Sequence, residues 1–198
     1  MSHFNSVAND WDSEDKIKQI KIHANAIKKN LGEIKDQRIL DFGAGTGLLG
    51  FEFIDNAKSL LGIDTSQGML DVMALKAKDI SKVSTLNINL ENESLDNEFD
   101  LIISSMAFHH LNKPGIVLQK LANALTKNGK IVIIDLDEED GTFHPDNKKM
   151  GVKHFGFNQS QIKSWIKDEN LNVEISIINK IEKNQKTYGQ FMAIFSHK

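Results

Sequence analysis

The sequence contains no cysteine, only two prolines and a single arginine, Arg38, among its 198 residues. The lack of cysteine excludes disulfides, thiolate metal sites and any reaction that needs a cysteine nucleophile, and it fits a reducing compartment. With one arginine and a formal net charge of −3, the chain lacks the basic field and the bidentate phosphate-binding side chains typical of nucleic-acid-binding proteins. Its composition therefore disfavours a DNA or RNA partner.

Long apolar runs are also missing: no stretch approaches the roughly 20 residues that span a bilayer. The first residues, Met1–Asn5, lack the basic and apolar regions of a signal peptide. We therefore expect a cytoplasmic protein with no membrane partner. The length suits a single domain over residues 1–198, with a helical segment at 1–30 before an α/β core at 38–198.

The most informative stretch of the chain is 38–50. Ile39, Leu40 and Phe42 form a short apolar run typical of a strand buried on both faces of a parallel sheet. Glycines follow at alternate positions 43, 45 and 47, and a helical pattern begins at Leu48. A strand, a glycine turn and a helix together predict that the backbone approaches a ligand closely at this point.

Two ligand classes compete for this turn. Residues 45–50 match the dinucleotide pattern G-x-G-x-x-G, which indicates a nicotinamide-dependent oxidoreductase. Asp41 argues against that interpretation, because a carboxylate just before the turn would repel a pyrophosphate. The same carboxylate would attract a cation such as an ammonium or sulfonium group.

Asp41 and the glycines that follow resemble the first motif of the class I S-adenosylmethionine-dependent methyltransferases, with no position missing. The resemblance implies S-adenosylmethionine as cofactor and S-adenosylhomocysteine as product. It also implies cofactor contacts from the residues of the motif: Asp41, Gly43, Ala44, Gly45, Thr46 and Gly47.

Further segments resemble the same family. Residues 4–12 are similar to the family's opening motif, which implies a lid over the cofactor that includes Trp11; the alternative is a helix pinned by its aromatic residues. Asp64 follows the second apolar strand and can accept hydrogen bonds from ribose hydroxyls, which both candidate cofactors carry. The family pattern also places Thr65, Met69, Asn89 and Leu90 near the nucleoside, with a register around Asn89 that is open by one residue. For Met69, an ordinary core methionine is the alternative.

Residues 99–111 carry the second strong resemblance, an apolar strand followed by two small residues and His-His-Leu. It implies that Ser104, Ser105, Met106 and His109 lie beside the methionine part of the cofactor. His109 and His110 are the candidate general bases, since histidine titrates near neutrality; the alternative is a purely structural histidine. The carboxylate that holds Mg²⁺ in metal-dependent relatives is missing, so we expect no metal.

Five carboxylates lie between Asp135 and Asp140 and predict either a solvated acidic loop or a rim that attracts a cationic amine. A metal site with His144 and His154 would lack any recognisable spacing. His144, His154 and Phe157 are candidates for the wall of a substrate pocket, with Phe155 beside them, and aromatic packing is the alternative.

The remaining periodicity predicts helices over 67–80, 113–125 and 158–170, and a turn at 128–130. Two final strands, 173–177 and 191–195, have no helix between them and should pair as an antiparallel hairpin. Together with the resemblance, this predicts an α/β fold: a Rossmann-like seven-stranded sheet, parallel except for a C-terminal antiparallel hairpin, with helices on both faces.

The function predicted from the sequence is transfer of a methyl group from S-adenosylmethionine to a small-molecule acceptor by in-line displacement. A protein that binds the cofactor without catalysis is an alternative from another class, and the nicotinamide-dependent oxidoreductase is a third. The acceptor atom (oxygen, nitrogen, carbon or sulfur), the use of a general base and the oligomeric state stay open.

Overall fold

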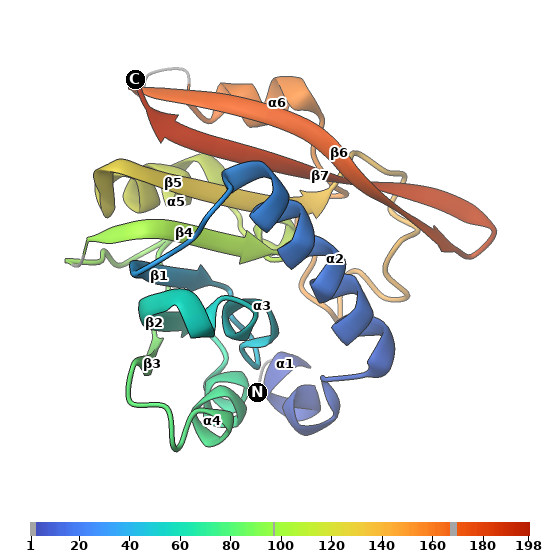
Figure 1. The fold of residues 1–198 in the computed structure, drawn as a ribbon. Coiled ribbons are helices and arrows are strands. Elements are labelled where there is room, and N and C mark those ends of the chain that lie inside the picture. The colour runs from blue at the N-terminus through green and yellow to red at the C-terminus, as the bar shows by residue number, and fades with distance from the viewer. Residues whose placement is uncertain (1–2, 97, 167–169) are drawn as a thin grey trace.

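The computed structural model describes residues 3–96, 98–166 and 170–198, which form one seven-stranded sheet flanked by helices (Figure 1). The strand order is β3-β2-β1-β4-β5-β7-β6. The strands are β1 (Gln37–Phe42), β2 (Ala57–Asp64), β3 (Val83–Asn87), β4 (Phe99–Ser105), β5 (Leu125–Leu136), β6 (Leu171–Lys183) and β7 (Lys186–His197). β1 to β5 pair in parallel, whereas β7 is antiparallel to both β5 and β6. The predicted fold class is confirmed.

The helices begin where the sequence offers capping side chains. Ser13, Ser66 and Asn158 each accept a hydrogen bond from a backbone N–H of the first turn. The α-helices are α1 (His3–Val7), α2 (Glu14–Leu31), α3 (Leu48–Phe51), α4 (Gln67–Lys76), α5 (Pro114–Asn123) and α6 (Gln159–Ser164). Short 3-10 helices lie at η1 (Ala8–Asp10), η2 (Ile54–Asn56) and η3 (Phe108–His110).

The apolar strands bury alternate residues in two cores, one on each face of the sheet. Ile39 and Ile103 pack with α2 and α3 on the face turned toward the viewer in Figure 1. Leu40 and Ile102 pack with α5 and α6 on the other face. Because successive side chains of a strand point to opposite faces, continuous apolar runs are what a sheet covered on both sides requires.

Several element boundaries differ from those predicted. The helix after the glycine turn has only four residues, and α4 ends at Lys76 rather than at 80. α6 ends at Ser164, and part of its predicted extension, 167–169, lies outside the described residues. The predicted hairpin is confirmed, with Val173 opposite Phe195 and Ile177 opposite Phe191.

The turn predicted at 128–130 is wrong, since these residues lie within β5. Leu125 pairs with Phe99 and Lys130 pairs with Leu101, so the chain bulges between two paired segments. Asp100 accepts a hydrogen bond from Thr126 Oγ1 at 3.2 Å and also binds Arg38, which holds the bulge against the sheet. The turn-forming residues at 128–130 therefore form a bulge within β5 and do not end a strand.

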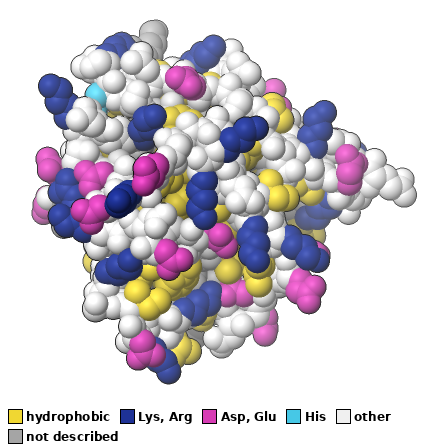
Figure 2. Space-filling model, in the orientation of Figure 1, with side chains coloured by type: hydrophobic (Ala, Val, Ile, Leu, Met, Phe, Trp, Pro, Cys, Tyr) yellow, Lys and Arg dark blue, Asp and Glu magenta, His cyan; other side chains and the backbone are white. Residues whose placement is uncertain are grey.

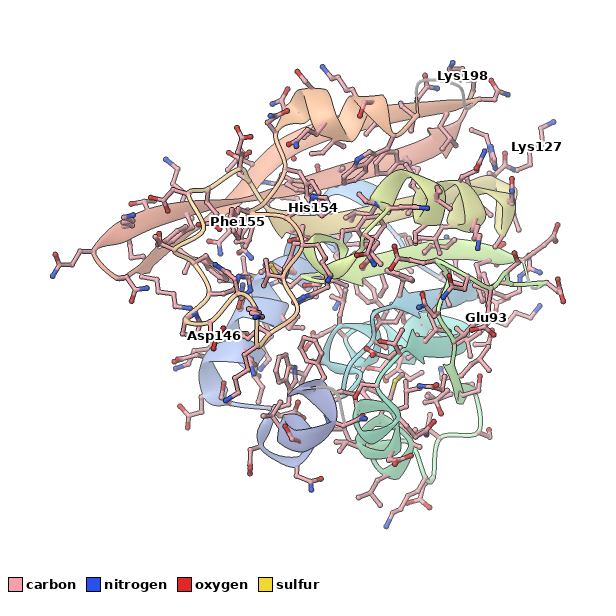
Figure 3. The ribbon with its side chains drawn as sticks, turned by 180° about the vertical axis from the view of Figure 1, so that it is seen from behind. Glu93, Lys127, Asp146, His154, Phe155 and Lys198 are labelled. Atoms are coloured by element: carbon pink, nitrogen blue, oxygen red, sulfur yellow. The ribbon has the colours of Figure 1, made fainter. Side chains whose placement is uncertain are left out.

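The carboxyl ends of the parallel strands define one edge of the sheet, from which the segment between β5 and α6 extends. Figure 3 shows Asp146, His154 and Phe155 on this segment, far from Lys127 at the start of β5. Ligands of open α/β sheets bind at this carboxyl edge. Among the described residues, no helix is long and apolar enough to cross a membrane.

Candidate functional site

A cavity of about 520 Å³ lies at the carboxyl ends of β1, β2 and β4. Its floor comes from the glycine loop after β1 and from the residues that follow β2, β3 and β4. Its roof comes from α1, the first turns of α2, the segment after β5 and the end of β6. The volume falls within the range of small-molecule sites, about 300–1,000 Å³.

The glycine loop is shaped by the strand beside it. The backbone N–H groups of Gly43 and Ala44 both donate to the carbonyl oxygen of Ile63, at 2.9 and 3.0 Å. Gly45 has a φ of +54°, and a Cβ built on it would meet only Trp11 Nε1, at 4.0 Å. A side chain at this position would therefore enter the cavity, so glycine leaves space for a ligand between the loop and Trp11.

Asp41, at the end of β1, supplies a buried carboxyl to the floor. Only 1% of its surface is exposed, and its Oδ2 accepts a hydrogen bond from the N–H of Gly50 at 2.9 Å. Burial raises the pKa of Asp41 to about 7 despite this hydrogen bond, and the charge of Asp64 adds to the rise. A cation bound beside Asp41 would relieve this cost and favour the carboxylate.

Asp64, at the end of β2, also lines the cavity. One oxygen accepts from Gly45 N at 2.9 Å and the other from Ser66 N at 2.8 Å. Burial raises the pKa of Asp64, opposed by these backbone donors. Each carboxylate oxygen retains a second lone pair, so the side chain can still accept from ligand hydroxyls.

Residues 3–12 cover this half of the cavity, and hydrogen bonds of Asn5 and Asp12 fasten them to the structure beneath. Asn5 Oδ1 accepts from Ser66 Oγ at 2.6 Å and from Gly68 N at 3.0 Å. Asp12 accepts from Thr46 Oγ1 at 2.5 Å and pairs with Lys76. The N-terminal segment is thus tied to the glycine loop and to α4, with Trp11 in the wall between them.

A buried imidazole–carboxylate pair lies further along the cavity. His109 Nδ1 is 2.7 Å from Asp135 Oδ1, and the backbone N–H of His109 donates to Oδ2 of the same carboxyl. Burial acts to raise the pKa of Asp135, but the His109 ring and nearby backbone donors outweigh it and hold that pKa below its usual value. An unprotonated Asp135 requires the proton on Nδ1, which leaves the lone pair of Nε2 available when the ring is neutral.

Nε2 of His109 is the reactive end of this pair. The ring is 1% exposed and lines the cavity, and Nε2 has no hydrogen-bond partner among the described residues. A buried polar atom without a partner is rare in folded proteins and marks a place where a ligand group can bind.

Comparison with known proteins matches residues 40–131 to a methyltransferase domain. An uncharacterized methyltransferase of Schizosaccharomyces pombe is 35% identical over 162 residues, 74% of this chain and 57% of that protein. This chain therefore spans somewhat more than half the length of that relative. An uncharacterized methyltransferase of Bacillus anthracis is 27% identical over 169 residues, 80% of this chain and 78% of that protein.

A solved structure of DhpI in complex with SAH has the same fold, with a TM-score of 0.74 at 13% identity, covering 98% of this chain and 93% of that chain. The chain is therefore similar to methyltransferases in sequence over this domain, and its fold is that of a structure solved with S-adenosylhomocysteine bound.

Most residues predicted for the cofactor site do line the cavity: Trp11, Asp41, Gly43, Ala44, Gly45, Thr46, Asp64, Thr65, Met69, Asn89, Leu90, Ser105, Met106 and His109. Two predicted residues are placed behind the lining. Ser104 is buried and donates to the carbonyl oxygen of Phe42, while Gly47 faces Phe51 and Met73. The roles of the lining residues stay predictions.

Of the residues predicted for catalysis or for the substrate pocket, His110 and His144 line the cavity, whereas His154 and Phe157 do not. Phe157 is 1% exposed and packs against Trp165 and Phe191 in the core beneath β5 and β7. His154 also packs against Phe157, with ring centroids 5.0 Å apart. Aromatic packing, the alternative stated for these residues, describes their surroundings.

The acidic segment after β5 is solvated only in part, with Glu138 and Asp140 exposed. Asp135 is fully buried rather than solvated, because β5 continues to Leu136. Glu139 accepts from the backbone of Thr142 and Phe143, and Asp140 pairs with Lys186, so both are used within the segment. None of the five carboxylates lines the cavity, and a rim for a cationic amine is therefore absent from the described residues.

The lining or supporting residues that the sequence analysis missed include Lys16, Gln19, Asp135 and Lys183. Lys16 and Gln19 have a detectable signal, because with His23 they recur at helical spacing and so interrupt the apolar face of α2 with polar groups. Lys183 comes from the far end of a hairpin, where no local pattern marks it.

Three histidines, His109, His110 and His144, lie together on one wall of the cavity. Ring centroids of His109 are 4.1 Å from those of His110 and 4.9 Å from those of His144. Among the described residues, no group of three or more histidine, cysteine or acidic side chains has the arrangement of a metal site. The absence of a metal stays a prediction.

Proposed function

We propose that this chain binds S-adenosylmethionine in the cavity and transfers its methyl group to a small-molecule acceptor. The cofactor would supply an electrophilic methyl group on a sulfonium sulfur, which departs as the neutral thioether of S-adenosylhomocysteine. Asp41 would face the cationic amino acid part, Asp64 the ribose, and the Asn89–Leu90 segment the adenine. The glycine loop would leave room for the cofactor. Residues 3–12 would close over the cofactor as a lid and exclude water.

The His109–Asp135 pair is the observation that favours catalysis over binding alone. A cofactor-binding protein without catalysis has no need for a buried imidazole whose free nitrogen faces a cavity. Held by Asp135, His109 would accept the proton of the acceptor's O–H or N–H group at Nε2 while the acceptor atom bonds to the methyl carbon. A general base contributes about 10²–10⁴-fold to the rate, and alignment of the two reactants contributes the rest.

A small-molecule acceptor is favoured by the surface as well as the cavity. On the face shown in Figure 2, Lys and Arg side chains are interspersed with Asp and Glu, so no basic patch offers a track for nucleic acid. The single domain, the cytoplasmic location and the absence of nucleic-acid and membrane partners stay predictions.

Thermal unfolding tests the cofactor first. S-adenosylhomocysteine at about 100 times its Kd should stabilise the fold by about 2.7 kcal/mol, a rise in Tm of roughly 5–10 °C for a chain of this size. NADH at the same concentration should leave the Tm unchanged. A rise with NADH alone would establish the oxidoreductase interpretation instead.

Labelled methyl transfer tests catalysis. The protein is incubated with S-adenosylmethionine carrying a labelled methyl group and with a small-molecule extract, and label in the metabolites is counted. We expect label transfer from the native protein and a loss of about 10²–10⁴-fold in His109→Gln. Binding of S-adenosylhomocysteine without any label transfer would favour the non-catalytic alternative.

A further inference from the structure

The charges that line the cavity are separated by sign. Asp41, Asp64 and Glu91 lie on the floor near the strand ends, where the cofactor is proposed to bind. The roof carries Lys16 from α2 and Lys183 from the end of β6. The part of the cavity beyond His109 is therefore lined by one cation and by no carboxylate of the described residues.

Lys183 keeps its charge available because the nearby acids are bound elsewhere. Asp140 is paired with Lys186 and Glu182 with Thr187, while Oε2 of Glu139 accepts from backbone N–H groups and its Oε1 is buried. Among the described residues, no carboxylate lies within ion-pair distance of Lys183 Nζ. This half-buried ammonium group has an aromatic ring as its neighbour instead.

A row of three rings connects Lys183 to the imidazole proposed as the base. Lys183 Nζ lies 4.5 Å from the centroid of the Phe143 ring. The Phe143 ring is 4.9 Å from that of His144, which is 4.9 Å from that of His109. The row has a fixed cation at one end and a proton acceptor at the other.

His144, in the middle of this row, is kept neutral at physiological pH. Burial lowers the pKa of His144 to about 4, and the nearby His109, His110 and Lys183 add to the shift. Its Nδ1 is buried and has no hydrogen-bond partner among the described residues. A neutral ring with a free polar atom can hydrogen-bond a ligand but does not neutralise an anion, which leaves that task to Lys183.

On the basis of the proposed methyl transfer, we propose that the acceptor is a small anion. Its carboxylate or phosphate group binds Lys183, its body lies along Phe143 and His144, and its nucleophilic O–H or N–H group reaches Nε2 of His109. In the reaction, the proton passes to Nε2, the acceptor atom bonds to the methyl carbon, and the electron pair of the broken carbon–sulfur bond stays on sulfur. The acceptor's anionic group is not itself methylated.

Binding of simple anions to the protein tests this proposal without knowledge of the acceptor. Benzoate, inorganic phosphate and the neutral benzamide are titrated into the full chain, with and without S-adenosylhomocysteine, and the imidazole signals of His144 are followed by NMR. We expect a saturable shift with benzoate or phosphate and none with benzamide. The two anions distinguish a carboxylate from a phosphate as the preferred group.

Variants of two lysines on β6, Lys183 and Lys180, decide whether Lys183 binds the anion. Lys183→Met should weaken anion binding about tenfold, as expected for loss of a charged hydrogen-bond donor, and Lys183→Arg should restore most of it. Lys180→Met is the matched control, because Lys180 lies on the same strand, is exposed and does not line the cavity. Equal responses to benzoate and benzamide, or equal anion affinity in Lys183→Met and the native protein, would overturn the proposal.

The titrations with S-adenosylhomocysteine distinguish failure of the small-anion proposal from failure of the proposed function. If S-adenosylhomocysteine does not bind, the methyl-transfer proposal is wrong whatever the anions do. If it binds and the anions do not, only the identity of the acceptor class is wrong.

Discussion

The floor of the cavity is assembled from the ends of adjacent strands, whereas its roof is assembled from segments at opposite ends of the chain. Asp41 and Asp64 lie on paired strands, and backbone N–H groups fix both carboxyls. Lys16 and Lys183, by contrast, rest on the aromatic rings of Trp11 and Phe143. The floor is set by backbone geometry, and the roof by side chains that only the tertiary fold brings together.

This difference indicates which half can vary. A floor held by strand pairing and glycine conformation tolerates few substitutions, because each one changes the path of the backbone. A roof of side chains can change its chemistry without changing the fold. We therefore expect substitutions in the floor to affect cofactor affinity, and substitutions around the roof and the buried pair to affect turnover and acceptor binding.

The largest effect is expected from Asp135→Asn, which removes the carboxylate that holds the proton on Nδ1 of His109. An amide can donate to Nδ1 and so move the proton to Nε2, which abolishes the base. We expect kcat to fall by about 10²–10⁴-fold, with the Kd for S-adenosylhomocysteine unchanged within about threefold.

Asp140→Asn is the control for this variant, since Asp140 belongs to the same acidic segment but is exposed and paired with Lys186. Steady-state kinetics and calorimetric binding should give native values. A native kcat in Asp135→Asn would show that the pair is structural only.

The second effect is expected from Asp41→Asn, which removes the negative charge from the floor. The Kd for S-adenosylmethionine should rise about tenfold or more, as expected when a charged partner is lost, measured by calorimetry near neutral pH. An unchanged cofactor affinity would show that Asp41 does not interact with the ligand. It would contradict the assignment of cofactor binding to the floor of the cavity.

A smaller effect is expected from Asp12→Ala, which cuts the contacts to Thr46 and Lys76. Loss of one fastening of the lid should raise the dissociation rate of S-adenosylhomocysteine by about three- to tenfold, since one such contact contributes about 1 kcal/mol. Stopped-flow displacement measures this rate. Asp15→Ala, an exposed acid at the start of α2, should leave it unchanged.

The smallest effect is on the pH dependence of stability, where two groups of residues oppose each other. Asp41 has a pKa raised from 3.8 to about 7 in the folded protein. Between these two values the folded protein holds a proton that the unfolded chain releases. The free energy of unfolding therefore falls as the pH rises from about 4 to about 7. His23 and His144 have lowered pKa values, so unfolding takes up protons below pH 6.5 and stability falls as pH drops.

Asp41→Asn removes the contribution of Asp41 to the pH dependence of stability. We expect urea unfolding of the variant to show stability that rises more steeply between about pH 4 and about pH 7 than in the native protein. Parallel curves for the two proteins would mean that Asp41 is ionised throughout this range.

The sequence predicted the floor well because its signals are local. The spacing of glycines after β1 and the acid at the end of β2 reflect backbone requirements that few other residues can meet. The hairpin was predictable for the same reason, since two strands without an intervening helix can only pair antiparallel.

Other features of the site could not be predicted in this way. Asp135 belongs in sequence to an acidic run, and only the pairing of β5 with β7 as far as Leu136 shows that it is buried. Phe157 belongs to an aromatic cluster that resembles a pocket wall, yet it packs in the core. Lys183 is brought to the cavity by the length of β6, which extends well beyond the predicted strand.

The polar residue in the middle of α2 has a consequence for how the site opens. His23 Nδ1 is 2.9 Å from Ser105 Oγ and Nε2 is 3.0 Å from Gln190 Oε1, while Gln190 in turn donates to the sulfur of Met106. This network joins the helix to β4 and β7, whereas residues 3–12 are held through the side chains of Asn5 and Asp12. Under the proposed function, product release would then require only the N-terminal segment to detach, with α2 held in place by His23. Residence time of the product and global stability would be separate properties, and each could change without the other.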